Sequence, residues 1–524
     1  MRWRGRQIGR RWTFVLTTGV GRNMVAVLRT VRIASPRQRW LLASGLLIWI
    51  GTALMTGCGA GVSHLPAGSA SGSLVTFATD APVCDVESFS VAITSASLVP
   101  ENGGSPVPLI SSTAPATVDF ARLADFTSIL NLSNNVPAGT YTGLQLSLAN
   151  PQLVVLNPSV TPPIPQAVPA TLATASLTIT ISPALVTSTE SAAGLTVDFD
   201  LQKSLQVNNS GQVTGTVDPQ IAVSAAVAAG STVGEADALY GMVQSVTAAN
   251  LPVNFTGSFV LALGDGTGQT LTVLSNDNTV FEGDDVAKFS DLTANTFVEV
   301  DAIVNTGGQL VAQTIDAEEQ TSAVSQKSAF LGTVLSVQRP ASGNATAFTL
   351  LVDDEVPSLS GTVPVHSTLN VTLQGSVHYF TNWQNWNRQA FTFGPQTLGA
   401  GEKVAVFGVL QAGGTLAAGQ VFLRPRNIAG NFKTLQKAGS DGKSGGFSLV
   451  PCGDLLSGQP LTVVTYSDTS FSGVGGLAAL TATPTLNTTG VLFYQLVSGK
   501  TAGGASWTAP AWVMQARGIR QLPD

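Results

Sequence analysis

The chain has 524 residues and a formal net charge of −6 at pH 7, and only 11% of its residues are charged, against about 25% in typical globular domains. Ten of its 25 Lys and Arg residues precede Cys58 and no Asp or Glu does, so the remainder carries a net charge of −16. This acidic balance argues against a nucleic-acid partner, because phosphate binding needs basic patches.

The first predicted element is an N-terminal export signal. An apolar run, residues 41–55, follows an arginine-rich segment and ends in small residues before Cys58. A secretory signal has this order and an apolar core of about 7–15 residues, whereas a membrane-spanning helix needs about 20. The alternative is an uncleaved N-terminal anchor helix. Translation from Met24 would leave a leader of ordinary length.

Residues 54–58, LMTGC, resemble the lipobox of bacterial lipoproteins, with Met55 where Leu is usual. In that family the cysteine is lipidated and becomes the first mature residue. The resemblance therefore implies a signal peptide over residues 1–57, lipidation of Cys58 and attachment to the membrane through the lipid. Gly59 follows the cysteine, which by the same resemblance implies the outer membrane of a Gram-negative cell. Residues 58–72 are expected to form a flexible tether.

Residues 73–227 are predicted to form an antiparallel β-sandwich. Apolar and polar residues alternate over residues 89–98, 141–148 and 177–181, and this period of two indicates half-buried strands. Turn signals separate these runs, and a single short helix is expected at residues 120–130. Several strands without long helices favour a sandwich.

Three short segments of this domain carry a family resemblance: residues 79–82 (TDAP), residues 137–141 (PAGTY), and residues 197–200 (VDFD) followed by Ser204. Together they resemble an uncharacterised bacterial and archaeal lipoprotein domain of unknown function that is thought to be prealbumin-like. The resemblance implies a fold and a location, but no activity.

Repeats follow an Ala/Gly/Ser linker at residues 226–235. Residues 268–283 and 458–473 are identical at eight of 16 positions, and residues 241–246 align with residues 332–337. Glycine pairs suited to tight hairpins lie near the end of each repeat. They predict three small β-barrel units, the last divergent, at residues 237–322, 328–426 and 427–521. The units resemble another domain of unknown function, an OB-like barrel often found in tandem in exported bacterial proteins.

The sequence predicts an all-β protein without a catalytic centre, metal or cofactor. Its histidines after the leader, His64, His366 and His378, lack zinc-site spacing. Four carboxylate clusters could suit calcium, but none has EF-hand spacing, and we expect solvated strand ends. These clusters are Asp80/Asp85/Glu87, Asp198/Asp200, Glu282/Asp284/Asp285 and Asp353/Asp354/Glu355.

Two cysteines remain after Cys58 is assigned to lipidation. Cys84 and Cys452 could pair only if the first and last domains touch, and two cysteines make no disulfide framework. We expect two buried thiols.

Residues 378–388 (HYFTNWQNWNR) place four aromatic residues among amides, inside the second repeat. One hypothesis is a platform that stacks on a glycan or contacts an envelope protein. The alternative, which we favour, is a loop that packs its tryptophans over the end of a barrel. The candidate ligand-binding residues are Tyr379, Phe380, Trp383 and Trp386.

The sequence thus predicts a lipid-anchored, non-enzymatic cell-envelope protein with a structural or binding role. The alternative is an envelope enzyme, or an accessory subunit of one, whose surface carboxylates act on a substrate such as a polysaccharide. Acid–base work of that kind needs two carboxyl groups at a defined separation in a cleft.

Overall fold

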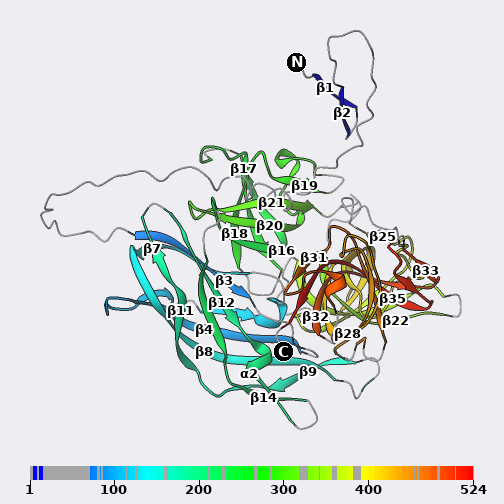
Figure 1. Ribbon diagram of the computed structural model, residues 1–524, viewed down its shortest axis with the longest axis horizontal. Coiled ribbons are helices and arrows are strands. Elements are labelled where there is room, and N and C mark those ends of the chain that lie inside the picture. The colour runs from blue at the N-terminus through cyan, green and yellow to red at the C-terminus, as the bar shows by residue number, and fades with distance from the viewer. Residues whose placement is uncertain are drawn as a thin grey trace, which may run out of the picture. The chain divides into compact units, whose positions relative to one another are not determined.

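The structure is a computed structural model built almost entirely from β-strands (Figure 1). It describes residues 4–8, 11–15, 71–79, 83, 86–113, 115–123, 128–157, 160, 163–189, 191–208, 212–226, 230–248, 251–264, 269–282, 286–317, 328–340, 343–356, 363–381, 391–453, 455–456, 459–480, 484–501 and 503–522.

The chain divides into two compact units, Met1–Ala67 and Gly68–Asp524. In the first unit, β1 (Arg4–Ile8) and β2 (Arg11–Val15) form an antiparallel hairpin. The apolar run of the predicted leader, Cys58 and the tether up to residue 70 lie outside the described residues. Among the residues that are described, no helix is long and apolar enough to cross a membrane.

The first domain of the second unit is a β-sandwich whose two layers join in one ten-stranded sheet, in the order β5-β4-β8-β11-β15-β12-β3-β7, with β6 and β9 paired to β4 and β8. Its strands are β3 (Ser71–Thr79), β4 (Val86–Pro100), β5 (Val107–Ile110), β6 (Ala116–Asp119), β7 (Ser128–Pro137), β8 (Gly139–Asn157), β9 (Ile164–Pro169), β11 (Ser176–Thr187), β12 (Ala193–Phe199) and β15 (Ile221–Ala226). A small second sheet contains β10 (Thr171–Leu172), β13 (Leu205–Val207) and β14 (Val213–Val217).

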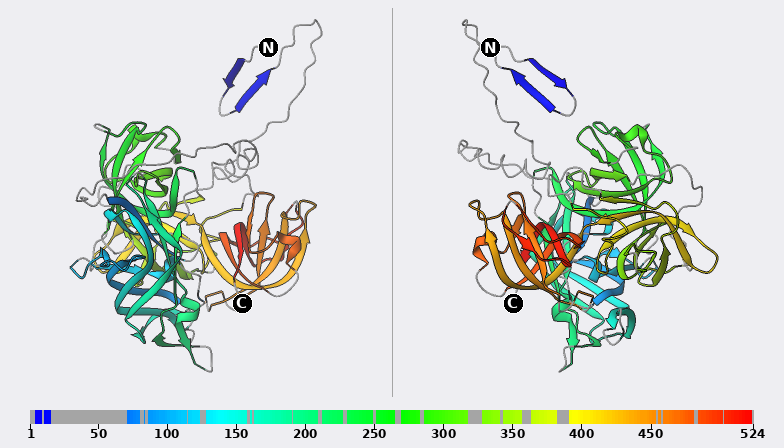
Figure 2. Two further views of the ribbon diagram at one scale, coloured as in Figure 1. Left: turned by 60° about the vertical axis from the view of Figure 1, so that its left-hand side comes forward. Right: turned by 90° about the vertical axis from the view of Figure 1, so that its right-hand side faces the viewer.

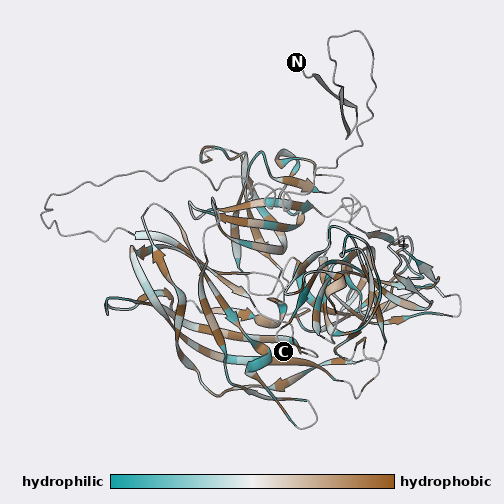
Figure 3. Cartoon of the chain, in the orientation of Figure 1, coloured by the Kyte–Doolittle hydropathy of each residue, from teal (hydrophilic) through white to brown (hydrophobic). Residues whose placement is uncertain are grey.

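Apolar and polar residues alternate along these strands (Figure 3). The apolar ones, such as Phe89, Val91 and Ile93 of β4, are buried in the sandwich core. The rings of Phe89, Phe120 and Phe199 meet there, with centroids 5.4 Å and 4.7 Å apart for the two pairs that include Phe199. The sandwich is not purely antiparallel, because β12 pairs with β3 in parallel.

The helix expected at residues 120–130 is wrong. Phe120–Leu123 is one turn of 3-10 helix, η1, and β7 begins at Ser128. Phe120 and Leu123 are both buried in the sandwich core, so the spacing that suggested a helix belongs to a single turn. The one α-helix among the described residues, α2 (Leu201–Ser204), was not predicted, and its four residues are too few to show a helical period.

Three barrels follow, which confirms the predicted fold class. Each is a six-stranded sheet in which strands one to three form a meander, strand one pairs with strand five, and strands three and six close the barrel in parallel. Apart from the short fourth strand, this is the strand order of an OB-fold. Figure 2 shows the third barrel in orange and red.

The strands of barrel 1 are β16 (Thr232–Thr247), β17 (Gly257–Leu263), β18 (Thr270–Ser275), β19 (Val280–Glu282), β20 (Phe297–Asn305) and β21 (Leu310–Ala317), with η2 (Phe289–Asp291). Those of barrel 2 are β22 (Ser328–Gln338), β23 (Ala347–Val356), β24 (Thr368–Thr372), β25 (His378–Thr381), β26 (Lys403–Leu410) and β27 (Thr415–Arg424). Those of barrel 3 are β28 (Arg426–Ala438), β29 (Gly445–Pro451), β30 (Leu461–Thr465), β31 (Ser470–Ser472), β32 (Thr485–Gln495) and β35 (Ala511–Gln521), with η3 (Leu477–Ala479) and an inserted hairpin of β33 (Gly499–Lys500) and β34 (Ser506–Trp507).

A threonine that is identical between the first and third repeats occupies the equivalent place in both barrels. Thr279 and Thr469 each accept a hydrogen bond at Oγ1 from the backbone amide three residues earlier, at 2.9 Å in both barrels. Each then donates to a carbonyl of its barrel's last strand, at 2.9 Å and 3.0 Å. The shared threonine therefore fixes the connection between the third and fourth strands.

The domains of the second unit share their cores. Val75, Phe77 and Ile129 of the sandwich pack into the core of barrel 1. Because β15 ends at Ala226 and β16 already begins at Thr232, half of the segment expected as a linker, residues 226–235, is strand. Phe391 of barrel 2 in turn meets Phe493 of barrel 3 at 5.0 Å.

Cys452 is disulfide-bonded, so the expectation of a buried thiol is wrong at this position. The other two cysteines, Cys58 and Cys84, lie outside the described residues. The expectation treated the first and last domains as separate, whereas the sandwich and barrel 3 belong to one compact unit. Leu156 of β8 and Leu455 of barrel 3 pack in the same apolar cluster.

A glycine in the first strand of each barrel lets two backbones approach closely. A Cβ atom on Gly241, Gly332 or Gly430 would lie 2.2, 2.0 or 2.5 Å from a carbonyl oxygen of the next strand. Replacing Gly332 with Ala should therefore lower the melting temperature, at a cost of about 1–3 kcal/mol or more. Gly394→Ala, at a site with nothing within 4 Å, is the matched control. Equal melting of the two variants would contradict this account.

Candidate functional site

Two of the four aromatic residues in the candidate binding stretch contribute to packing. Phe380 stacks on Phe422 with ring centroids 4.6 Å apart, and Tyr379 meets Phe393 edge-on at 5.7 Å. Both side chains are half-buried, and burial raises the pKa of Tyr379 to about 12. Trp383 and Trp386 lie outside the described residues. The platform hypothesis therefore rests on the two tryptophans.

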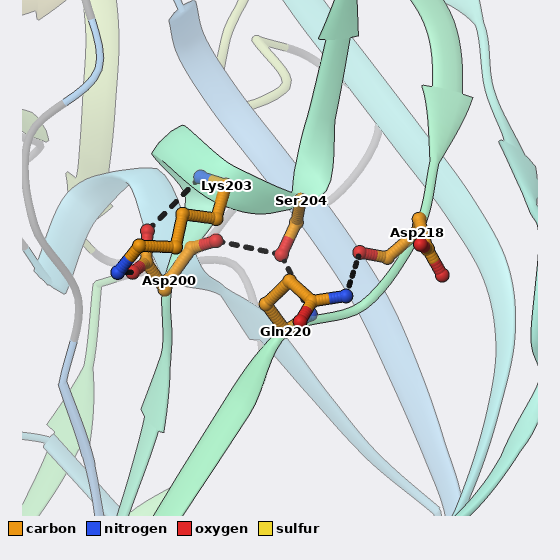
Figure 4. Close-up of polar contacts among 5 residues, drawn as sticks. All are labelled: Asp200, Lys203, Ser204, Asp218 and Gln220. Atoms are coloured by element: carbon orange, nitrogen blue, oxygen red, sulfur yellow. Dashed lines mark hydrogen bonds and ion pairs between the residues drawn. The ribbon is translucent and has the colours of Figure 1, made fainter.

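The family-resembling segment around Asp200 forms a structural network (Figure 4). Asp200 caps α2 by accepting from Lys203 N at 3.0 Å, and its carboxylate pairs with Lys203 Nζ at 2.6 Å. The fully buried Ser204 donates from Oγ to Asp200 O at 2.6 Å and accepts from Gln220 N at 2.9 Å. Gln220 Nε2 donates to Asp218 O at 3.4 Å. These bonds join the end of β12 to β15, so the motif serves the fold.

The carboxylates of the fourth predicted cluster are not solvated strand ends. Asp354 and Glu355 are each only 3% exposed. Arg122 of the sandwich donates to Asp354 at 2.6 Å, and Lys403 lies 3.6 Å from Asp353. The sandwich covers this end of β23, and a sequence position alone could not reveal that cover.

Beside this pair, Asp119 of the sandwich holds His366 of barrel 2. Asp119 Oδ2 accepts from His366 Nε2 at 2.8 Å and from Ser88 Oγ at 2.7 Å, and Oδ1 accepts from Phe89 N at 2.9 Å. Burial alone would raise the pKa of Asp119, but His366, Arg122 and Ser88 together hold that pKa below its usual value. His366 has a left-handed φ of 63°.

Ser88, His366 and Asp119 do not form a nucleophilic triad. In a triad the serine gives its proton to the histidine, which the carboxylate orients. Here the serine and the histidine both bind the same carboxylate oxygen, so the aspartate is the centre of the cluster. The arrangement can hold two domains together and can sense protons, but it does not activate Ser88.

A second charged junction joins barrels 1 and 2. Arg424, at the end of β27, is 4% exposed and contacts Glu299 of β20, while its other terminal nitrogen lies 3.7 Å from Asp316 of β21. Burial lowers the pKa of Arg424. The rings of Phe297 and Phe407 meet beside it at 5.4 Å.

A third junction joins barrels 2 and 3 through Glu402, which is fully buried. One carboxylate oxygen accepts from Gly399 N at 2.9 Å and the other from Tyr494 N, in barrel 3, at 3.1 Å. Burial raises the pKa of Glu402 to about 8, although both amide donors and the charge of Arg339 act in the opposite direction.

The titratable groups of these three junctions were not predicted as a site. Their partners are separated by as many as 247 positions in the case of Asp119 and His366, and no local motif marks them. Within the described ranges, no group of three or more His, Cys, Asp or Glu residues could hold a metal ion. Of the other predicted clusters, Asp80, Asp85, Asp284 and Asp285 lie outside those ranges.

Two segments match family models. Residues 71–214 match a domain of unknown function, DUF4382, and residues 240–316 match another, DUF5666. These matches agree with the two resemblances drawn from the motifs, and neither description names an activity. No curated protein matches the chain. A solved structure described as drosophila Unr CSD456 is 11% identical and covers 55% of this chain and 97% of its own, with a TM-score of 0.13, too low to carry an argument.

The Asp119 cluster predicts acid sensitivity. A lowered pKa means that the folded protein gains stability from ionised Asp119 above about pH 4, and loses it as the pH falls through the folded-state value. Asp119→Asn should cost about 1–3 kcal/mol at pH 6, since His366 and Ser88 lose a charged acceptor, and should flatten the loss of melting temperature between pH 5 and pH 3. Glu101→Gln, at an exposed turn, is the control. Parallel curves for wild type and Asp119→Asn would refute this role.

Glu402 predicts the opposite slope. Its raised pKa means that the folded state holds a proton that the unfolded state releases, so stability is complete below about pH 4.5 and is lost as the pH rises toward 8. Melting temperature should fall from pH 5 to pH 9 in the wild type and change less in Glu402→Gln. Glu235→Gln, on an exposed position of β16, should keep the wild-type slope. A wild-type slope in Glu402→Gln would show that another group is responsible.

Proposed function

We propose that this protein is a lipid-anchored protein of the bacterial cell envelope, with a structural or binding role and no catalytic activity. The observation that carries the proposal is the segment of residues 41–58, in which an apolar run of leader length ends in a lipobox-like LMTGC. By that resemblance Cys58 carries the lipid and the destination is the outer membrane of a Gram-negative cell.

The disulfide at Cys452 supports export. Disulfides form and persist in oxidising compartments and are rare in the cytosol. The low content of charged residues agrees with this interpretation.

A binding or spacing role is favoured over catalysis by how the described carboxylates are used. Asp119, Asp354 and Glu402 take part in contacts between domains, and Asp200 caps a helix. An enzyme acting on a polysaccharide would need a pair of acids facing a cleft. These four acids instead bind partners within the fold. A glycan or an envelope protein remains the proposed partner, with Trp383 and Trp386 as the contact residues.

Lipidation is tested at Cys58. Cells fed an alkyne fatty acid should label the wild-type protein, which should also partition into detergent, whereas Cys58→Ser should remain an unlabelled precursor. Glu101→Gln, at an exposed turn, is the control and should label like wild type. Labelling that survives in Cys58→Ser, or a wild-type protein of unmodified mass, would overturn the proposal.

A further inference from the structure

Barrel 3 differs in charge from the rest of the chain. Residues 426–521 contain seven Lys and Arg residues and three Asp and Glu residues, a net charge of +4, whereas residues 58–425 contain eight and 27, a net charge of −19. Such an asymmetry suggests that the basic part meets an anionic surface.

Four lysines of barrel 3 are exposed: Lys433 and Lys437 on β28, Lys443 in the turn between β28 and β29, and Lys500 on β33. We call Lys437, Lys443 and Lys500 the lysine cluster, because the inserted hairpin lies against the start of β29, where a Cβ atom on Gly503 would be 3.3 Å from Gly445 N. Among the described residues, none of these four takes part in an ion pair. Their charges therefore face solvent, which differs from the buried arginines and carboxylates at the domain junctions.

The inserted hairpin brings Lys500 next to β28. Ser506 N, which lies opposite Lys500 in the β33–β34 register, donates to Gln436 Oε1 at 2.9 Å. The side chain of Lys437 lies across the hairpin turn, where a Cβ atom on Gly504 would be 2.2 Å from its Cδ. Lys437 and the hairpin that carries Lys500 are thus in direct contact.

The same insertion exposes two adjacent apolar side chains. Leu496 is 48% exposed and Val497 is 75% exposed. Trp507 is buried and holds this turn in place, because its indole Nε1 donates to Val497 O at 2.9 Å. Barrels 1 and 2 connect the corresponding strands through residues 306–309 and 411–414 only. The insertion with its apolar pair therefore belongs to the barrel that carries the positive charge.

We propose that the lysine cluster and the Leu496–Val497 turn of barrel 3 bind an anionic lipid surface. Exposed apolar side chains next to lysines are the combination that interfacial membrane binding uses: the apolar groups enter the headgroup region and the lysines pair with lipid phosphates. A protein that is held at a membrane by one end, as proposed above, would then also be oriented on it through its last barrel.

Charge alone would also suit a single-stranded nucleic acid, but the aromatic residues do not. Such binding stacks bases on accessible aromatic rings, and no aromatic side chain of barrel 3 is exposed in the part of the barrel that the structure describes. The exposed apolar residues of this region are aliphatic, which favours lipid.

The test uses residues 59–524, which contain the whole compact unit Gly68–Asp524 and lack both the leader and the anchor cysteine, so that neither contributes to binding. Flotation with vesicles of phosphatidylcholine, with or without about 30% phosphatidylglycerol, should show binding that needs the anionic lipid and weakens with salt. The triple variant Lys437→Glu/Lys443→Glu/Lys500→Glu should bind about a hundredfold more weakly, at about 1 kcal/mol per lysine. Leu496→Ser/Val497→Ser should lose about tenfold.

Matched controls come from barrel 1. Lys288→Glu and Val253→Ser alter an exposed lysine and a valine that is 86% exposed, and both should bind like the parent, whereas the single change Lys500→Glu should weaken binding. All substitutions are on the surface, so melting temperatures should agree.

Equal binding to neutral and anionic vesicles, or parental binding by the triple variant, would overturn the proposal. Binding to heparin or single-stranded DNA without binding to anionic vesicles would overturn it as well. Because the anchor cysteine is absent from every variant, failure here is separate from failure of lipidation at Cys58.

Discussion

The arrangement of this protein depends on charges that are buried between its domains. Arg424 of barrel 2 lies between Glu299 and Asp316 of barrel 1, and Arg122 of the sandwich pairs with Asp354 of barrel 2. Removing ions from water is costly, and the mutual attraction repays that cost only in good geometry. A displaced domain would leave an unpaired charge in an apolar setting, so the pairs select one arrangement of the domains over others that would bury similar apolar area.

Shared apolar cores stabilise the contacts between domains, but they do not by themselves select one arrangement of the domains. Phe77 of the sandwich fills the space beside Gly234 of barrel 1, where a side chain on the glycine would clash with the ring at 2.3 Å. Apolar contacts of this kind favour any close approach, since burial is non-directional. The buried ion pairs require a particular orientation of the domains, because each charge must meet its partner. The hydrogen bond from an amide of the next barrel to the fully buried Glu402 has the same effect.

Much of the fold could be predicted from the sequence, because it depends on local patterns. Alternation over residues 89–98 and 141–148 lies within β4 and β8, and the aligned Gly241 and Gly332 hold equivalent places in two barrels. The predictions that were wrong depended on a segment too short to show a period, or on contacts between residues far apart in the sequence. The single 3-10 turn at Phe120 has the residue spacing of a helix over one period only. Asp354 and Glu355 were predicted to be solvated strand ends, because nothing near them in the sequence indicates that they are buried.

The order of the junctions along the chain has a consequence for biogenesis. Asp119 and Arg122 precede their partners His366 and Asp354 by more than two hundred positions. A chain that crosses a membrane from its N-terminus would present the sandwich with hydrated, unmatched charges until barrel 2 had followed. During that interval the sandwich lacks its final surroundings, and a chain cut short before barrel 2 would keep those charges exposed, so that an incomplete molecule differs chemically from a finished one at this surface.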